Sequence, residues 1–296
     1  MNNTDLYIYA ASANAWPIDD HIPNLKPQIK ELCGRSFRRT NHYIDLGILG
    51  VNRCASHSEK ELSPQCGVFI ATEQGNVSDG IDINKQIFVD KEAPMPFQFI
   101  NVSNNLAGFY VAQSLNLLST NITISRRDFP FEAALEMASL DLQLSNLDSC
   151  LVGGLDECSL PLDQHCQRMS LPVGTPLSEG SSWLYIGNTP QDAIAKYQLF
   201  SPLTSYEEMI NTLDDIDIDS HYYLSGGYRI NEEELQNISQ SLGITRRYDY
   251  LDTARYHDTN AAYGISAFIE QKKGRHLLHI NKDYLNRYII IYVSTI

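Results

Sequence analysis

Short β-rich runs alternate with stretches of helical apolar spacing along almost the whole of this 296-residue chain. The β-rich runs end at polar or glycine residues, which is typical of strands. In the first part of the chain we predict strands at 6–12, 66–72, 121–125, 149–154 and 182–188. Helices are predicted at 104–117 and 131–147, and the apolar face of the first would contain Leu106, Phe109, Tyr110 and Leu117. Such alternation favours a layered α/β fold with helices on the faces of a sheet.

The same alternation repeats in the second part of the chain. We predict a helix near 191–197, a strand over 215–227 that ends in a glycine turn, helices at 232–242 and 261–271, and a final hairpin of strands at 276–280 and 288–294. The repeat indicates two β/α halves, an N-terminal half at 1–168 and a C-terminal half at 169–296.

The charge balance restricts the classes of partner. Lys and Arg number 22 against 36 Asp and Glu, so the net charge is −14 and the pI is near 4.9. An acidic surface repels phosphate backbones and anionic lipid, so nucleic acid and membrane surfaces are not expected partners. The most apolar run, at 288–293, is far shorter than the roughly 20 residues of a membrane helix.

The cysteines indicate a reducing compartment. Six cysteines include no Cys-x-x-Cys pair, and we expect no secretory signal at the N-terminus. Both features are typical of reduced thiols in a cytoplasmic protein. Zinc binding by Cys158, His165 and Cys166 is disfavoured, because their spacing fits no common zinc motif. We therefore expect no metal and no cofactor.

Five stretches, read in order, resemble a β-ketoacyl synthase of the thiolase fold. The stretch at 96–115, PFQFINVSNNLAGFYVAQSL, is similar to the family's dimer seam, and the run from NITIS to GGLDE at 121–157 is similar to its strand, nucleophile elbow, helix and Gly-Gly-acid turn. The stretch at 176–188, PLSEGSSWLYIGN, is similar to the strand that opens the second half. The stretches at 225–234 and 256–270 stand where the family's two histidine motifs belong. The resemblance covers nearly the whole chain and implies a thiolase-like α-β-α-β-α layering of two halves.

The resemblance also implies where catalytic residues would stand. An active synthase uses a cysteine thiolate at a helix N-terminus, two histidines and a supporting lysine. The matching positions here hold Asp128 for the cysteine, Ser225 and Asp258 for the histidines, and Thr253 for the lysine. A carboxylate cannot form the thioester, and neither Ser225 nor Asp258 offers a neutral imidazole. We therefore expect a chain that is not catalytic by itself.

A synthase-like chain with a replaced elbow residue resembles the chain length factor, the non-catalytic half of a ketosynthase heterodimer in type II polyketide systems. Because this chain is shorter than a typical synthase, it is most similar to the trimmed factors of bacterial aryl polyene systems. The resemblance implies a catalytic ketosynthase as partner, with an acyl carrier protein that docks mainly through that partner.

The resemblance further implies contact residues. Phe97, Phe99, Asn104, Phe109 and Tyr110 would lie at the dimer seam, where aromatic rings either bound the acyl tunnel or are plain core residues. The basic cluster Arg35, Arg38 and Arg39 would contact the acidic carrier protein, or would lie on a solvated helix face.

Two alternatives stay open at this point. Asp128 is either a residual catalyst or a structural remnant that stabilises the N-terminus of the following helix. The chain as a whole is either a non-catalytic subunit or a thiolase-fold acyltransferase or hydrolase that uses an off-position group such as Cys150 or His257. The position of Cys150 in a strand favours the first reading.

Overall fold

The computed structural model describes residues 6–296 apart from 20–21, 204, 215–217 and 219–220. Within these residues, ten strands form one sheet. The order is β4 (Asn121–Ser125), β3 (Gly67–Thr72), β5 (Ser149–Asp156), β6 (Leu177–Gly187), β1 (Leu6–Ser12), β7 (Ala195–Leu203), β10 (Tyr288–Thr295), β9 (His276–Lys282) and β8 (Tyr222–Gly226), with β2 (Ala15–Ile18) paired to β6.

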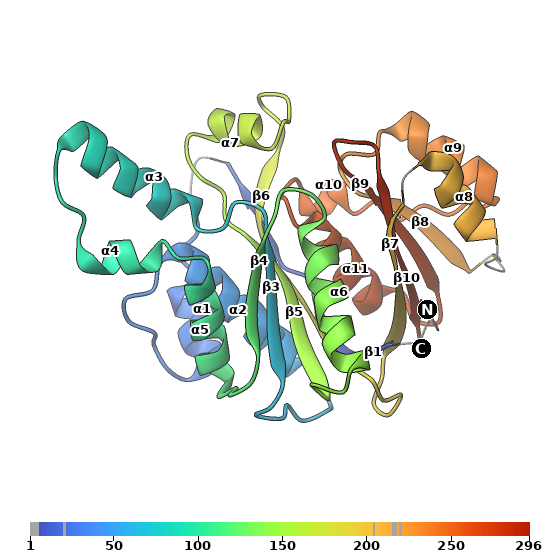
Figure 1. The fold of residues 1–296 in the computed structure, drawn as a ribbon, viewed down its shortest axis with the longest axis horizontal. Helices are drawn as coiled ribbons and strands as arrows, with labels where there is room; N and C mark the ends of the chain where they lie inside the picture. Colours follow the sequence, from blue (N-terminus) through green and yellow to red (C-terminus); the bar gives the residue numbers. More distant parts are fainter. Residues whose placement is uncertain (1–5, 20–21, 204, 215–217, 219–220) are drawn as a thin grey trace.

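Two helices lie between the two halves of this sheet. They are α6 (Pro130–Gln143) and α11 (Asn260–Gln271), and one hydrophobic core joins them to strands of both halves. That core contains Phe131 of α6, Phe268 of α11, Phe69 of β3 and Val293 of β10. The two helices are therefore the central layer of the molecule (Figure 1).

Two further helical layers cover the outer faces. Helices α1 (Lys26–Cys33), α2 (His42–Ser56) and α5 (Asn105–Leu115) pack over the N-terminal strands, and α8 (Tyr206–Asp214) and α9 (Glu232–Leu242) pack over the C-terminal strands. Figure 1 shows the resulting α-β-α-β-α order. The predicted α/β, thiolase-like layering is confirmed.

The remaining helices lie outside these layers. Helix α3 (Val77–Lys85), a π-helical turn η1 (Gln86–Asp90) and α4 (Pro96–Asn101) form an arm that extends from the body in Figure 1. We refer to residues 77–101 as the arm. Two short helices, α7 (Leu162–Arg168) and α10 (Leu251–Ala254), lie above the strand ends.

The strands predicted in the first part are present, and the final hairpin is the antiparallel pair of β9 and β10. The strand predicted over 215–227 is β8 in its second part, and 215–217 and 219–220 lie outside the described residues.

The helix predicted near 191–197 is wrong, because a strand begins there. Strand β7 lies between β1 and β10, where Tyr197 is the partner of Leu6 and of Val293. Tyr197 is also buried, and its hydroxyl lies 2.8 Å from the hydroxyl of Ser139 on α6. Pairing on both sides therefore overrides the local helical pattern.

The apolar face predicted for the helix at 104–117 is only partly right. The buried residues of α5 are Ala107, Gly108 and Val111, whereas Phe109 is 53% exposed. The reason is α2, a helix absent from our sequence prediction. It packs against α5 so closely that a Cβ on Gly47 would lie 3.3 Å from Val111. Small residues therefore make this contact, and the large ring points outward.

The boundary between the predicted halves 1–168 and 169–296 stays a prediction. Strand β1, from the start of the chain, lies between β6 and β7, so strands of both halves belong to one continuous sheet. Among the described residues, no helix combines the length and the apolar character that crossing a membrane requires.

Candidate functional site

Three buried carboxyl groups meet at one edge of the N-terminal strands. Strands β3 and β5 are parallel, so their carboxyl ends lie side by side. Glu73 directly follows β3, Asp156 ends β5, and Asp258 precedes α11. We call these three residues the carboxyl cluster. Ligand sites of α/β proteins often form at this edge of a sheet, so the cluster is our candidate site.

Hydrogen bonds tie the cluster to the ends of both strands. The Thr72 hydroxyl donates to Asp156 Oδ1 at 2.8 Å, and the Glu73 backbone N–H donates to the same oxygen at 3.1 Å. Gln74 Nε2 donates to Asp258 Oδ2 at 2.9 Å. These bonds fix two carboxyl groups from distant parts of the chain.

A single arginine from the C-terminal half faces the cluster most closely. Arg229, in the loop after β8, places Nη2 3.5 Å from Glu73 Oε2 and donates to the Tyr284 hydroxyl at 2.9 Å. Its guanidinium also lies over the rings of Tyr228 and Tyr284, at 4.7 Å and 4.2 Å from the ring centroids. Tyr228 in turn donates to Asp258 Oδ1 at 3.3 Å. Three carboxyl groups therefore face one close guanidinium.

Burial raises the pKa of all three carboxyl groups. Burial, together with the nearby Asp258, raises the pKa of Glu73 to about 9. Burial and Asp258 also raise the pKa of Asp156 to about 8, and burial raises the pKa of Asp258. The cluster therefore retains protons to a higher pH than ordinary carboxyl groups do. It contains no thiol and no imidazole.

A cavity of about 430 Å³, lined by residues of the C-terminal half, lies next to the cluster. Tyr228 lines this cavity and bonds to Asp258 behind it, so the tyrosine separates the cavity from the carboxyl cluster. Burial, and then Asp258, hold the pKa of Tyr228 well above its usual value. The hydroxyl therefore acts as a neutral donor.

The four positions that the family resemblance assigns to catalytic residues lie in different surroundings in the structure. Asp258 belongs to the carboxyl cluster. Asp128 lies half-buried in the turn between β4 and α6, one residue before Phe129, which has a left-handed backbone (φ 53°) and is the N-cap of α6. Ser225 is buried in β8, and its hydroxyl has no hydrogen-bond partner among the described residues. Thr253 is exposed on α10.

Two arginines connect the segments that hold Asp258, Asp128 and Ser225. Arg127, beside Asp128, lies over the Tyr284 ring at 4.1 Å, and Arg229, in the loop after Ser225, contacts the same tyrosine. The turn before α6 and the loop after β8 therefore meet at Tyr284, and Arg229 links them to Asp258 through Glu73. Thr253 takes no part in this arrangement.

Sequence reasoning missed Glu73, Asp156 and Arg229, which form the centre of the site. The sequence does carry one signal for the first two, because each stands at the end of a predicted strand. Polar residues at the carboxyl ends of parallel strands are common site residues. Arg229 has no comparable signal.

The two off-position groups are enclosed in the protein. Cys150 is fully buried in β5, and burial raises the pKa of its thiol. His257 is 1% exposed, Ser178 Oγ lies 2.9 Å from its Nδ1, and burial lowers its pKa to about 3. Neither group reaches the surface or a described cavity.

The residues considered for zinc make other contacts. His165 Nδ1 lies 3.0 Å from Ser159 Oγ, and Cys158 and Cys166 belong to a small hydrophobic core. Across the part of the chain that the structure describes, no group of three or more His, Cys, Asp or Glu side chains is arranged to hold a metal ion.

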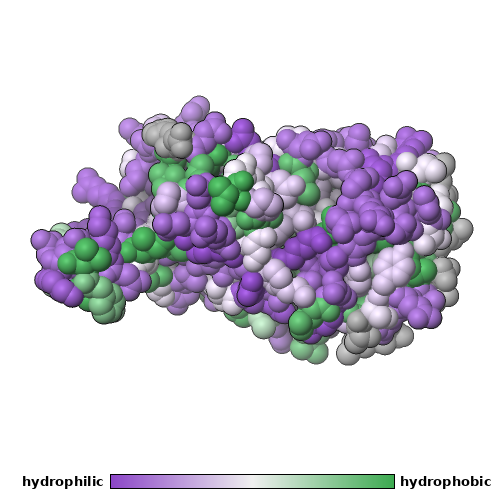
Figure 2. Space-filling model, turned by 90° about the horizontal axis from the view of Figure 1, so that it is seen from above, coloured by the Kyte–Doolittle hydropathy of each residue, from purple (hydrophilic) through white to green (hydrophobic). Residues whose placement is uncertain are grey.

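The predicted seam residues lie on the arm and on α5. Phe97, Phe99 and Phe109 are 42%, 67% and 53% exposed. Tyr110 is half-buried, with its ring edge-on to Phe37 at 6.4 Å. Figure 2 shows hydrophobic side chains gathered along the arm, at its left. The arm therefore presents aromatic side chains that remain largely exposed among the described residues.

Polar side chains fasten the base of the arm. Asn104 Oδ1 accepts from the backbone N–H of Asn76 at 3.0 Å, and Asn41 Nδ2 donates to Asp79 Oδ2 at 2.8 Å. Asn76 Nδ2 donates to the carbonyl of Asn101 at 2.5 Å. Asn104 thus connects segments of its own chain.

The basic cluster lies in the bends after α1, so its three arginines are solvated, as one alternative expected, but they do not lie on a helix. Gly34 ends α1 in a left-handed conformation (φ 65°), which stops the helix just before Arg35. The guanidinium of Arg35 lies over Phe37 at 4.9 Å, and that of Arg39 lies over Phe97 at 4.1 Å. Arg38 is exposed.

No protein-family model and no curated protein matches the sequence of this chain. Solved structures do match it. The structure of the ishigamide ketosynthase/chain length factor is similar to this chain at 14% identity and a TM-score of 0.71, and the alignment covers 99% of each of the two chains. The AntDE:AntF structure, a type II polyketide synthase acyl-carrier protein in complex with its ketosynthase bound to the hexaketide, aligns with 99% of this chain and 100% of its own at 12% identity and a TM-score of 0.70.

Two further structures extend the comparison. The PfaC ketosynthase–chain length factor aligns with 99% of this chain and 43% of its own at 10% identity and a TM-score of 0.72. A variant of OleA of Xanthomonas campestris aligns with 99% of this chain and 98% of its own at 11% identity and a TM-score of 0.58. The chain has the thiolase-like ketosynthase fold. In this ketosynthase fold, the carboxyl cluster lies at the ends of β3 and β5.

Proposed function

We propose that this chain is a non-catalytic chain length factor subunit of a ketosynthase heterodimer. The observation that carries the proposal is the make-up of the candidate site within a ketosynthase fold. Protonated carboxyl groups, tyrosines and an arginine stand there, and none of them can form a thioester. The acyltransferase or hydrolase alternative loses its support, because Cys150 and His257 are enclosed.

The edge of the sheet supports a partner of similar fold. Among the described strands β4 is an end strand that pairs with β3 alone. An uncovered edge strand invites pairing with another chain. Large apolar side chains flank this edge on α5, α6 and the segments that follow them, and these are Phe109, Leu118, Met137, Leu140 and Leu144. We propose that the catalytic ketosynthase covers this surface.

The same proposal assigns the exposed aromatic residues. Phe97, Phe99, Phe109 and Tyr110 would bound the partner's acyl tunnel and so limit product length. The basic cluster Arg35, Arg38 and Arg39, in which all three side chains are exposed, would contact the acyl carrier protein. We further propose an aryl polyene system and a cytoplasmic location, which agrees with six free thiols.

The test is the position of covalent adducts in the heterodimer. The complex is incubated with acyl-carrier protein, or with the cysteine-directed inhibitor cerulenin, and the intact mass of each chain is measured. We expect the adduct on the partner alone. A partner whose active-site cysteine is replaced by alanine is the control, and it should carry no adduct. A stoichiometric adduct on this chain would refute the non-catalytic reading.

A further inference from the structure

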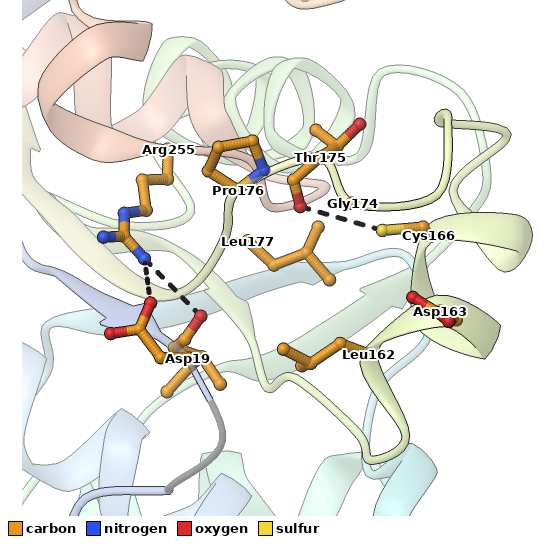
Figure 3. Close-up of a pocket in the computed structure, with 10 residues that line it drawn as sticks. Asp19, Leu162, Asp163, Cys166, Gly174, Thr175, Pro176, Leu177 and Arg255 are labelled. Carbon is orange, nitrogen blue, oxygen red and sulfur yellow. Dashed lines mark hydrogen bonds and ion pairs between the residues drawn. The ribbon is translucent and has the colours of Figure 1, made fainter.

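A second cavity lies apart from the carboxyl cluster and from the arm. It has a volume of about 360 Å³ and is enclosed by the end of β2, helix α7, the start of β6 and the residue after α10 (Figure 3). The lining consists of Ile18, Asp19, Leu162, Asp163, Cys166, Gly174, Thr175, Pro176, Leu177 and Arg255. This volume lies within the range of ligand sites, about 300–1,000 Å³.

The floor of this cavity is apolar. Ile18, Cys166 and Leu177 are 2%, 1% and 1% exposed and belong to one hydrophobic core. The Cys166 thiol donates to the carbonyl of Thr175 at 3.8 Å, so its weak donor is already used. A ligand on this floor therefore meets hydrocarbon and sulfur, which suits an apolar body.

Arg255 forms one end of the cavity, and part of its guanidinium has no acceptor among the described residues. Its Nη1 contacts Asp19 Oδ1 at 2.9 Å and the carbonyl of Ile18 at 3.5 Å. The described residues supply no further acceptor to this guanidinium. Asp19 is 86% exposed, and an ion pair with so exposed a carboxylate holds weakly. A carboxylate from solution can therefore share the guanidinium or displace Asp19.

The backbone of Arg255 is held in an unusual conformation. Its φ of 57° and ψ of −158° belong to a region that side-chain-bearing residues rarely adopt. Two hydrogen bonds maintain it, from Arg255 N–H to the Leu251 carbonyl at 2.8 Å and from Asn260 Nδ2 to the Arg255 carbonyl at 2.9 Å. The position from which the guanidinium extends is thereby fixed.

A carboxylate stands at the other end. Figure 3 shows Asp163 across the cavity from Arg255, with Leu177 between them. Asp163 is exposed and makes no hydrogen bond or ion pair within the described part of the chain. The cavity thus presents a cation, an apolar floor and an anion in sequence.

We propose that this cavity binds a small elongated molecule with a carboxylate at one end and a hydroxyl or ammonium donor at the other, joined by an apolar body. The carboxylate takes the spare donors of Arg255, the donor end bonds to Asp163, and the body lies on Ile18, Cys166 and Leu177. This site does not depend on the proposed subunit role, because it shares no residue with the carboxyl cluster or the arm.

The probe is 8-hydroxyoctanoate, titrated calorimetrically against the full chain in the assembly in which it purifies. Octanoate lacks the donor end, and 8-hydroxyoctanamide lacks the charge. We expect 8-hydroxyoctanoate to bind at least tenfold more tightly than the amide and a few-fold more tightly than octanoate. No binding, or equal binding of the acid and the amide, would overturn the proposal.

Variants assign each end. Arg255→Gln should abolish the preference for acid over amide, and Asp163→Ala, which removes the acceptor, should abolish the preference for 8-hydroxyoctanoate over octanoate. Arg246→Gln, an exposed arginine elsewhere, is the matched control and should change neither preference. Asp19→Asn, at an exposed position with little bearing on folding, should strengthen binding of the acid two- to fivefold. Acid binding that is unchanged in both Arg255→Gln and Asp19→Asn would refute the assignment.

Discussion

Glu73, Asp156 and Asp258 bring three acidic groups into a space where one arginine faces them closely. Fully ionised, they would leave uncompensated charge in the protein interior, which is strongly unfavourable. Raised pKa values remove that charge, since the groups keep protons to higher pH. The protonation of the carboxyl cluster therefore depends on pH, and no pattern in the sequence indicates this.

This sensitivity gives a prediction for stability. The pKa of Glu73 is about 9 in the folded chain and near its ordinary value of about 4 when unfolded. Between these values the folded state binds more protons, so the free energy of unfolding falls as pH rises. The stabilisation is complete below about pH 4 and is lost towards pH 9. From about pH 5 to pH 9 the native chain should lose about 1–3 kcal/mol more than Glu73→Gln, measured by denaturant unfolding.

Glu31→Gln is the matched control for that series, because Glu31 is exposed on α1. It should follow the native pH profile. Parallel profiles for the native chain and Glu73→Gln would show that Glu73 ionises normally.

A second prediction concerns Asp128. Its Oδ1 is buried without a hydrogen-bond partner among the described residues, so replacement by asparagine removes no bond of that atom. Under the proposed function, Asp128→Asn should leave condensation by the heterodimer within a few-fold of normal. Asp148→Asn, at an exposed site, is the control. A hundredfold loss of rate, about 2.7 kcal/mol, would instead give Asp128 a part in the chemistry.

Asp258 was identified from the sequence as the residue in place of a catalytic histidine, whereas Glu73, Asp156 and Arg229 were not singled out at all. Family motifs mark positions along the chain, and Asp258 stands in one of them. The other three become neighbours only through the topology, because β3, β5 and the loop after β8 meet at one place. No local pattern carries that information.

At the scale of the element, strands with clear apolar runs were predicted well, whereas helix α2 was not predicted. Helix α2 carries Gly47 and Gly50, which lower its helical propensity. Both serve close packing, since a Cβ on Gly50 would lie 2.5 Å from the carbonyl oxygen of Ser181 in β6. The feature that hid this helix from sequence analysis is the one that lets it approach the sheet.

Replacement by alanine should have opposite effects on the free energy of unfolding at two helical glycines, Gly50 and Gly80. Gly50→Ala places a methyl group against the backbone of β6 and should reduce the free energy of unfolding by about 1–3 kcal/mol. Gly80→Ala, on α3, meets no atom within 4 Å and should be neutral or stabilising by up to about 1 kcal/mol. Thermal and denaturant unfolding measure both. A harmless Gly50→Ala would mean that α2 can move away from the sheet.

The arm and α5 offer variants that separate folding from assembly. Phe99 is 67% exposed, so Phe99→Ala should change the stability of the chain by less than about 0.5 kcal/mol. If the ring contacts the partner, the same change should weaken the heterodimer by about 1–2 kcal/mol or lengthen the product. Gel filtration reports assembly, and mass spectrometry reports product length.

Tyr110→Ala is the contrasting variant, because Tyr110 is half-buried against Phe37 and its loss disturbs the chain itself. Intact heterodimers with unchanged products for Phe97→Ala, Phe99→Ala, Phe109→Ala and Tyr110→Ala would place the control of length elsewhere.

At the scale of the whole molecule, the layer order was predictable from the alternation of strands and helices, but the sheet order was not. The fold matches ketosynthase structures closely at 14% identity or less. So low an identity suffices because the layering needs only apolar residues at the right period.

The position of β1 leads to a prediction about the two halves. Because β1 pairs with β6 and β7, a fragment of residues 169–296 lacks the strand between them, and a fragment of residues 1–168 leaves β1 without partners. Neither fragment alone should unfold cooperatively, whereas a mixture of both should recover a cooperative transition by circular dichroism. A cooperatively folded fragment 169–296 would show that β6 and β7 can do without β1.

The central place of β1 also bears on how the chain emerges from the ribosome. Residues 6–12 are made long before their partner strands β6 and β7, which begin at Leu177 and Ala195. At about 5–20 residues per second this delay is on the order of ten seconds or more. During that interval an apolar strand with both edges open is exposed to other nascent chains, so production of this protein should depend on translation speed and on chaperones that bind early.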